Sequence, residues 1–157
     1  LNRGIDLGGN SFSPALELTV GVGVNPAAID MERELERYRN KIEAGAEYAI
    51  TQPVFDVDCF RRFIDRTGKF NLPVIAGIWP FASFKNAEFM ANEVPGVTVP
   101  ADMLERMSRA GSREDAIKTG TAIAREMMTA LEQYTAGFAV SAPLGNVNIA
   151  LAVLGLS

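Results

Sequence analysis

An apolar run of strand length, followed by a segment with apolar residues at helical spacing, recurs about four times along the chain. The apolar runs lie at residues 16–24, 47–50, 72–78 and 137–141. Their connections are short, apart from a helical insertion at residues 100–107. Strands that alternate with helices in this way predict an α/β fold with a parallel sheet.

Polar capping residues mark where several of the predicted helices begin. Asp56 precedes the second helix, Ser83 precedes the third, and the sequence Ser112-x-x-Asp115 opens a long one. Each helix carries an apolar stripe that can cover the sheet. We expect the helices at residues 30–44, 56–67, 83–94, 100–107, 112–134 and 146–155.

Length and composition limit the chain to one ordinary globular domain and exclude several functions. It has 157 residues, of which 48% are hydrophobic, so it can bury a sizeable core. A formal charge of -4, with basic and acidic residues interleaved, argues against a nucleic-acid partner. The sequence contains no histidine, which excludes histidine-based catalysis, and we expect no metal site.

The single cysteine and the lack of long apolar runs indicate the cellular setting. Cys59 has no partner for an internal disulfide, and its place on a predicted helix favours a packing role. No apolar run has the length of a membrane span and no signal peptide opens the chain, so we expect a cytoplasmic protein with no membrane partner. The first residue is Leu1 and not methionine, which suggests a fragment or a processed chain.

The first apolar run has one aliphatic face and one glycine face. Aliphatic residues alternate with small or polar ones from Leu16 to Val24. We expect the aliphatic face to meet the helices and the face with Gly21 and Gly23 to meet the interior, where backbone can approach a flat ligand. The glycine pair is weak evidence by itself, because such pairs also mark bulges or close packing, and the third glycine of a dinucleotide-binding motif is absent.

Residues 49–56, with the sequence Ala-Ile-Thr-Gln-Pro-Val-Phe-Asp, place a polar pair at the end of a strand. Pro53 has no backbone donor, so we expect the central strand to end before it. Gln52 would then lie where a parallel strand meets its βα loop, which is where α/β proteins keep their chemistry. Its amide offers donors and an acceptor without charge, which suits the edge of a heterocyclic ring. The alternative is a glutamine that binds loop backbone.

Two further groups of residues have both a functional and a structural interpretation. Glu34, Arg37 and Lys41 form a helical stripe that could contact the hydroxyls and a phosphate of a ligand. By spacing alone we favour the alternative, a solvated face with ion pairs. Asn86 and Met90 share one face of a later helix, where spacing favours a core position for Met90.

Three motifs together carry a resemblance to a known family. They are residues 49–56, the sequence Pro-Val-Ile-Ala-Gly-Ile-Trp-Pro at residues 73–80, and Asn-Ala-Glu-Phe-Met-Ala-Asn-Glu-Val-Pro-Gly at residues 86–96. They resemble methylenetetrahydrofolate reductase, and most of all the reductase part of bifunctional homocysteine S-methyltransferase/methylenetetrahydrofolate reductase proteins. The resemblance implies a TIM-type (β/α)8 barrel that holds FAD, with residues 1–157 as a partial domain that forms its C-terminal half.

The resemblance also implies binding residues. Folate would contact Gln52, Asn86 and Met90, and FAD would contact Gly21, Asn25, Glu34, Arg37 and Lys41. Only Lys41 among the FAD positions keeps the residue of the better-known bacterial pattern. Glycine replaces an aromatic residue at 21, asparagine a histidine at 25, glutamate an aspartate at 34, arginine an asparagine at 37, asparagine a glutamine at 86 and methionine a phenylalanine at 90. The family's general-acid glutamate belongs to the other half of the barrel, so we expect no catalytic residue in this chain.

The implied function is the reduction of 5,10-methylenetetrahydrofolate to 5-methyltetrahydrofolate in one-carbon and methionine metabolism, with FAD as cofactor and NAD(P)H as co-substrate. The partial domain alone would be inactive. We expect a homo-oligomer, because a sheet cut from a barrel leaves two unpaired edges. Two alternatives stay open: a catalytically silent half-barrel that associates and binds ligand weakly, and another βα-barrel protein that binds phosphate.

Overall fold

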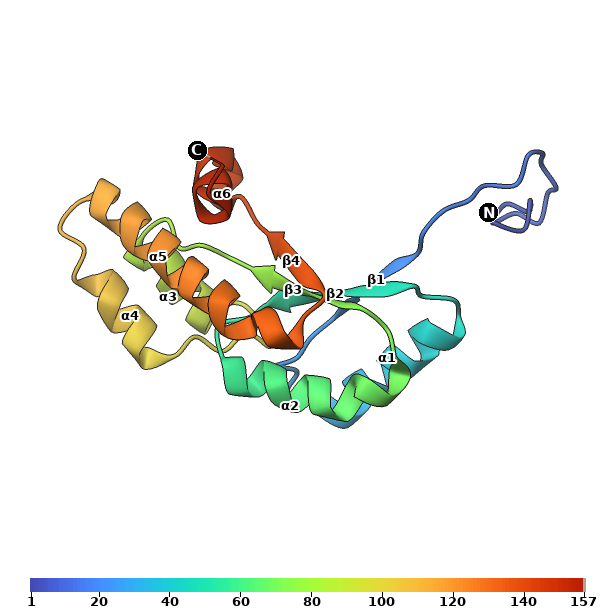
Figure 1. Cartoon of the computed structure of the whole chain (residues 1–157), viewed down its shortest axis with the longest axis horizontal. Coiled ribbons are helices and arrows are strands. Elements are labelled where there is room, and N and C mark those ends of the chain that lie inside the picture. Colours follow the sequence, from blue (N-terminus) through green and yellow to red (C-terminus); the bar gives the residue numbers. More distant parts are fainter. Residues whose placement is uncertain (157) are drawn as a thin grey trace.

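Four parallel strands lie side by side in chain order in the structure, a computed structural model that describes residues 1–156 (Figure 1). The strands are β1 (Gly21–Val24), β2 (Tyr48–Pro53), β3 (Val74–Ile78) and β4 (Gly137–Val140). The helices are α1 (Met31–Glu43), α2 (Val57–Thr67), α3 (Phe84–Asn92), α4 (Ala101–Ser108), α5 (Arg113–Leu131) and α6 (Val147–Leu154). The predicted α/β fold is confirmed, and parallel strands joined in order through helices are consistent with part of a (β/α)8 barrel.

The helices begin where the capping residues predict. The side chains of Asp30, Asp56, Ser83 and Ser112 each accept a backbone N–H bond in the first turn of their helices. The long fifth helix is shorter than predicted, because the chain tightens after Leu131 into a 3-10 turn at Glu132–Tyr134. At the other end of the chain, Gly155 adopts a left-handed conformation with φ of 71° and ends α6.

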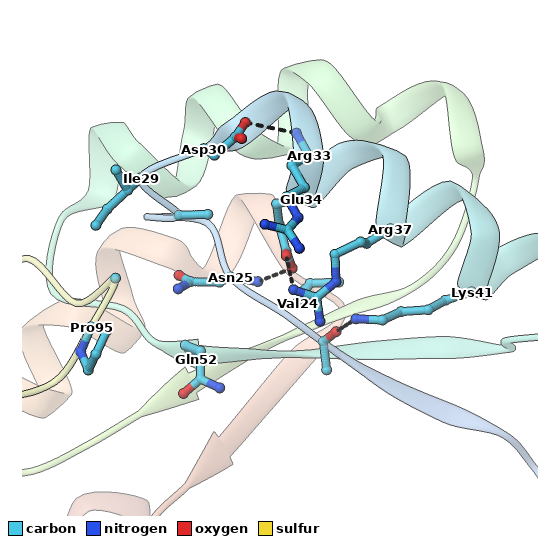
Figure 2. Close-up of a pocket in the computed structure, with 13 residues that line it drawn as sticks. Val24, Asn25, Ile29, Asp30, Arg33, Glu34, Arg37, Lys41, Gln52 and Pro95 are labelled. Atoms are coloured by element: carbon cyan, nitrogen blue, oxygen red, sulfur yellow. Dashed lines mark hydrogen bonds and ion pairs between the residues drawn. The ribbon is translucent and has the colours of Figure 1, made fainter.

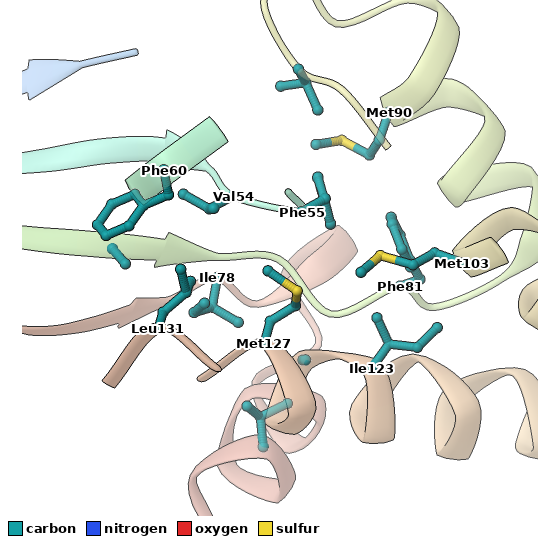
Figure 3. Packing of buried hydrophobic residues seen from close by; sticks show 14 of the residues in the cluster. Val54, Phe55, Phe60, Ile78, Phe81, Met90, Met103, Ile123, Met127 and Leu131 are labelled. Carbon is teal, nitrogen blue, oxygen red and sulfur yellow. The ribbon is translucent and has the colours of Figure 1, made fainter. Parts of the chain in front are cut away.

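One face of the sheet packs against helices and forms the core. Val24, Ala49 and Ile78, from three strands, are buried in this core. Phe60 of α2 and Leu131 of α5 are fully buried in the same core, which Figure 3 shows together with Ile78. Burying a side chain of this size stabilises the fold by roughly 1.5–3 kcal/mol. The predicted aliphatic face toward the helices is therefore confirmed for the paired part of β1.

Helix α5 approaches the loop after β3 at a glycine. A Cβ atom on Gly120 would lie 1.9 Å from the carbonyl oxygen of Phe81, so only glycine permits this distance. Phe81 in turn stacks on Phe55, with ring centroids 4.8 Å apart. The contact fixes α5 against the segment that leads from β3 into α3.

The opposite face of the sheet carries few large side chains. Gly21 and Gly23 of β1 pair with Tyr48 and Ile50 of β2, and these residues share this open face because side chains alternate along a strand. Ile50 is 37% exposed although it belongs to a central strand. The open face is therefore glycine-rich next to β1, as the alternation predicts.

The first strand is shorter than the predicted range of residues 16–24. Only Gly21–Val24 pair with β2, since β2 begins at Tyr48, and Leu16, Leu18 and Val20 are exposed. Residues 1–20 lead away from the body of the molecule (Figure 1). Alternation thus predicted a surface suited to pairing, but the partner strand does not extend that far.

The expectation that β2 ends before Pro53 is wrong. The strand continues to Pro53 through an irregularity in its register with β3. Gly77 N donates to the Thr51 hydroxyl at 2.9 Å, and Val54 N donates to the Gly77 carbonyl at 3.0 Å. A side-chain oxygen and the next amide thus replace the ladder bonds that a proline interrupts.

The last helix packs on the helix layer rather than along a strand edge. Arg125 of α5 donates to the carbonyls of Ala152 and Val153 at the end of α6. Cations stabilise helix C-termini, where carbonyl groups lack helical partners. Among residues 1–156, no helix has the length and apolar character to cross a membrane.

Candidate functional site

A cavity of about 680 Å³ opens where β1 and β2 end, on the side of the β1–α1 loop (Figure 2). Its walls come from β1, the loop after it, α1, the end of β2 and a turn between α3 and α4. The lining residues are Gly23, Val24, Asn25, Ala28, Ile29, Asp30, Arg33, Glu34, Arg37, Lys41, Gln52, Pro95 and Gly96. The carboxyl ends of parallel strands are where α/β sheets bind ligands.

Glu34 holds the loop that forms one wall. The residue is only 7% exposed, and Oε1 accepts the backbone N–H of Asn25 at 2.9 Å. Arg37 lies beside it, with Nη1 3.7 Å from Glu34 Oε2. The Asn25 side chain turns back and accepts the N–H of Ala27 at 3.0 Å. The buried carboxylate therefore orders the loop after β1, and its expected role as a direct FAD contact stays a prediction.

Cationic side chains from α1 face the same cavity. Lys41 Nζ donates to the carbonyl of Gly23 at 2.5 Å, which holds the ammonium group over the end of β1. Arg33 and Arg37 follow the same helix face toward its N-terminus (Figure 2). With Asp30 and Glu34 as the only carboxylates in the lining, the cavity carries an excess of positive charge in a chain of net charge -4. Such a surface suits an anionic ligand.

Gln52 closes the cavity from the neighbouring strand. It lies one residue before the end of β2, and its side chain is exposed on the open face, next to Ile50. The loop residue Asn25 and the α1 residue Lys41 line the same cavity (Figure 2). The structure thus brings Gln52 together with Asn25, Glu34, Arg37 and Lys41.

Three other predicted site residues lie elsewhere. The ring of Tyr48 fills the space beside Gly21, since a Cβ there would be 2.3 Å from Tyr48 Cζ. Met90 is 4% exposed and belongs to the core, as its spacing favours. Asn86 Oδ1 accepts N–H bonds from Trp79 Nε1 and Ala82 N, both at 3.3 Å. The roles of Gly21, Asn86 and Met90 in binding stay predictions.

Several lining residues were not predicted as site residues from the sequence. Arg33 precedes Arg37 and Lys41 at steps of four residues, so the helical spacing could have indicated it. Ile29 belongs to the β1–α1 loop and is 95% exposed. Pro95 and Gly96 come from a turn far along the chain, and no local sequence pattern predicts that this turn lines the cavity.

The donor set of the cavity fits a ligand with phosphate and hydroxyl groups. Arginine and lysine bind phosphate oxygens, and a glutamine amide can pair with a heterocycle. FAD has all of these groups, so the residues present are compatible with it. In the described part of the chain, no three His, Cys, Asp or Glu side chains are grouped to bind a metal ion.

Cys59 lies outside this cavity, in the first turn of α2. Its Sγ donates to the carbonyl of Pro26 at 3.2 Å. Burial, and then the nearby carboxylate of Asp56, raise the pKa of the thiol. A protonated, hydrogen-bonded thiol fits the packing role that the sequence favours.

Comparison with known proteins gives a consistent match. A sequence model of methylenetetrahydrofolate reductase matches residues 18–141. The chain is 33% identical over 113 residues to the 5,10-methylenetetrahydrofolate reductase of Escherichia coli strain K12, which is 70% of this chain and 38% of that protein. It is 37% identical over 79 residues to the enzyme of that name from Buchnera aphidicola subsp. Baizongia pistaciae, which is 49% of this chain and 26% of that protein.

A plant protein gives a weaker match of the same kind. The methylenetetrahydrofolate reductase (NADH) 1 of Arabidopsis thaliana is 28% identical over 115 residues, which is 66% of this chain and 19% of that protein. The chain thus spans less than two fifths of the length of each of these three relatives. The family match includes all four strands and the cavity at the ends of β1 and β2. The chain belongs to the methylenetetrahydrofolate reductase family.

Proposed function

We propose that the chain is the C-terminal half of a flavin-dependent methylenetetrahydrofolate reductase barrel, with residues 1–157 as a partial domain. The observation that carries the proposal is the cavity, which assembles Asn25, Glu34, Arg37 and Lys41 beside Gln52. The resemblance assigns the first four to FAD and the fifth to folate. A cofactor and a substrate that react must lie in contact. The residues assigned to FAD and the residue assigned to folate line the same cavity, which supports the proposal.

The cofactor, when bound, supplies the hydride chemistry between NAD(P)H and the folate. The residues of this chain would bind the cofactor and orient the substrate. Lys41 and Arg37 would hold phosphate or ribityl oxygens, while Glu34 keeps the loop of Asn25 in place. Gln52 would orient the pterin ring from the end of β2. Reduction of 5,10-methylenetetrahydrofolate to 5-methyltetrahydrofolate would then require the complete barrel.

The resemblance of the three motifs, at residues 49–56, 73–80 and 86–96, supports a parent protein of the bifunctional type. In such a protein, a homocysteine S-methyltransferase would use the methyl group that the reductase half provides. We place the parent protein in one-carbon and methionine metabolism on this basis.

A second candidate function follows from the open sheet face. Ile50 is 37% exposed in a central strand, and within residues 1–156 β1 and β4 each have one edge without a partner strand. A chain with these features could associate as a catalytically silent half-barrel that binds ligand weakly. Flavin binding without turnover by the isolated chain agrees with both candidates, so the deciding test uses the complete barrel.

The test is the substitution Gln52→Ala in a complete barrel that contains this segment. We expect kcat for folate reduction to fall by roughly 10- to 100-fold, because loss of one orienting amide misplaces the reacting ring. The dissociation constant of FAD should change by less than about two-fold, because Gln52 is assigned to the substrate. Gln133→Ala, which removes the exposed glutamine of the 3-10 turn after α5, is the matched control. Unchanged folate reduction in Gln52→Ala would contradict the proposed role.

A further inference from the structure

The turn at residues 94–97, between α3 and α4, forms the wall of the cavity that faces α1 (Figure 2). Val97 N donates to the Val94 carbonyl at 3.2 Å, and Val97 is buried in the core. Pro95 and Gly96 therefore reach the cavity from an anchored turn. The side chains of this turn are all apolar or absent, so they shape the cavity sterically.

Gly96 makes the closest approach of this turn to the loop after β1. Its φ is 72°, a left-handed conformation that favours glycine. A Cβ atom on Gly96 would lie 2.2 Å from Asn25 Nδ2 and 3.3 Å from Asn25 Cγ. The amide of Asn25 therefore occupies the space that any other residue at position 96 would fill.

Asn25 is held from two other directions. Its backbone N–H donates to the buried carboxylate of Glu34 at 2.9 Å, and its Oδ1 accepts the N–H of Ala27 at 3.0 Å. These bonds fix the backbone and one end of the amide. The Nδ2 end is directed at Gly96, which closes the third side. A side chain at position 96 would have to displace the amide or move the turn.

We infer that Gly96 is a positioning residue, which sets where the Asn25 amide lies in the cavity and so how tightly the cavity holds its ligand. The inference rests on the proposed function only in taking that ligand to be FAD. The turn follows α3, the helix that contains Asn86, so it links that helix to the wall of the cavity. The contact between Gly96 and Asn25 is made by residues of this chain alone.

Gly96→Ala and Gly145→Ala form a matched pair of variants. Gly145 has a φ of 75°, and a Cβ atom there would meet no heavy atom within 4 Å. Both substitutions therefore place alanine in the same strained backbone conformation, but only Gly96→Ala adds a collision with Asn25. The side-chain NH2 resonances of Asn25 in the ligand-free chain, measured by ¹⁵N–¹H NMR, report the position of the amide. Flavin fluorescence measures the dissociation constant of FAD.

We expect Gly96→Ala to shift the Asn25 NH2 resonances and to raise the dissociation constant of FAD by about five-fold or more, whereas Gly145→Ala should change neither. In an Asn25→Ala background the collision is absent, so Gly96→Ala should add less than about a two-fold further change. If Gly96→Ala alone does not fold, the double variant should still fold.

Several results would overturn the inference. Asn25 resonances at wild-type positions in Gly96→Ala would show that the contact does not set the amide. A loss of affinity that is equal with and without the Asn25 amide, or a double variant that does not fold, would have the same meaning. Failure of the wild-type chain to bind FAD would instead overturn the proposed function, while the ligand-free spectra would still decide the role of Gly96.

Discussion

At the scale of single residues, Lys41 is the cation with the clearest place in the cavity. Its ammonium group is held at the end of β1 by the Gly23 carbonyl and has donors left for a ligand. In a complete barrel, Lys41→Ala should raise the dissociation constant of FAD by about ten-fold, which corresponds to a charge-assisted bond of ~1.5 kcal/mol. Equilibrium titration measures it, with Lys118→Ala on the exposed face of α5 as control. Wild-type affinity would contradict this role and favour the alternative, in which Lys41 belongs to a solvated face of α1.

The sequence predicts which residues line the cavity better than it predicts the contacts that each of them makes. Glu34 and Lys41 belong to a helical stripe that spacing alone marks, but spacing favoured a solvated, ion-paired face. The structure instead buries Glu34, whose carboxylate accepts a backbone bond from Asn25. Gly96 could not be predicted, because its role depends on a contact between segments that are distant in the chain. Resemblance supplied Gln52 and Asn25 as ligand contacts where local pattern left their roles open.

At the scale of elements, an ion pair joins α4 to α5. Arg106 donates to both oxygens of Glu126, at 2.6 and 2.7 Å, and this lowers the pKa of Glu126 below its ordinary value of 4.5. A lowered pKa means that the contribution to stability is complete above the pKa of the unfolded chain. It is lost as the pH falls through the lower pKa of the folded chain.

A double-mutant cycle with Arg106→Ala and Glu126→Ala measures the contribution of this pair. We expect a coupling free energy of about 0.5 kcal/mol from urea unfolding at pH 7, a small value because both side chains are more than one third exposed. At a pH below the lowered pKa of folded Glu126, where the carboxyl is protonated, the coupling should approach zero. A coupling of equal size at both pH values would contradict the assigned cause.

The helices could be predicted more closely than the strands. Each capped helix begins at a polar residue that the sequence displays, so Asp30, Asp56, Ser83 and Ser112 locate their helices directly. A strand depends on its partner, which alternation does not reveal. Residues 16–20 therefore alternate like a strand but do not form one, while β2 continues through Pro53 because Thr51 and Gly77 supply other bonds.

At the scale of the whole molecule, the sheet is open, and its two edge strands are available to pair with another chain. The outer edges belong to β1, with the sequence Gly-Val-Gly-Val, and β4, with the sequence Gly-Phe-Ala-Val. Neither has a charge or proline of the kind that prevents edge-to-edge pairing. Within residues 1–156, neither terminal segment closes the sheet, because residues 1–20 lead away and α6 packs on α5 (Figure 1).

We predict that the isolated chain associates with itself. A two-fold axis along the axis of the barrel keeps all strands parallel, and it would place β4 of each copy beside β1 of the other. Light scattering on dilute, freshly purified chain should give at least the mass of a dimer. A monomer mass combined with low affinity for apolar dyes would contradict this and would mean that the edges are covered in solution.

The central claim is that the cavity beside β1 and β2 holds a flavin, and equilibrium dialysis of the purified chain against FAD tests it most directly. The cavity unites cations of α1 with Gln52, so we expect bound flavin to saturate near one FAD per chain. The absorbance of bound flavin and the protein concentration give this ratio without any need for catalysis. Flavin that stays equal on both sides of the membrane at every concentration would contradict the claim.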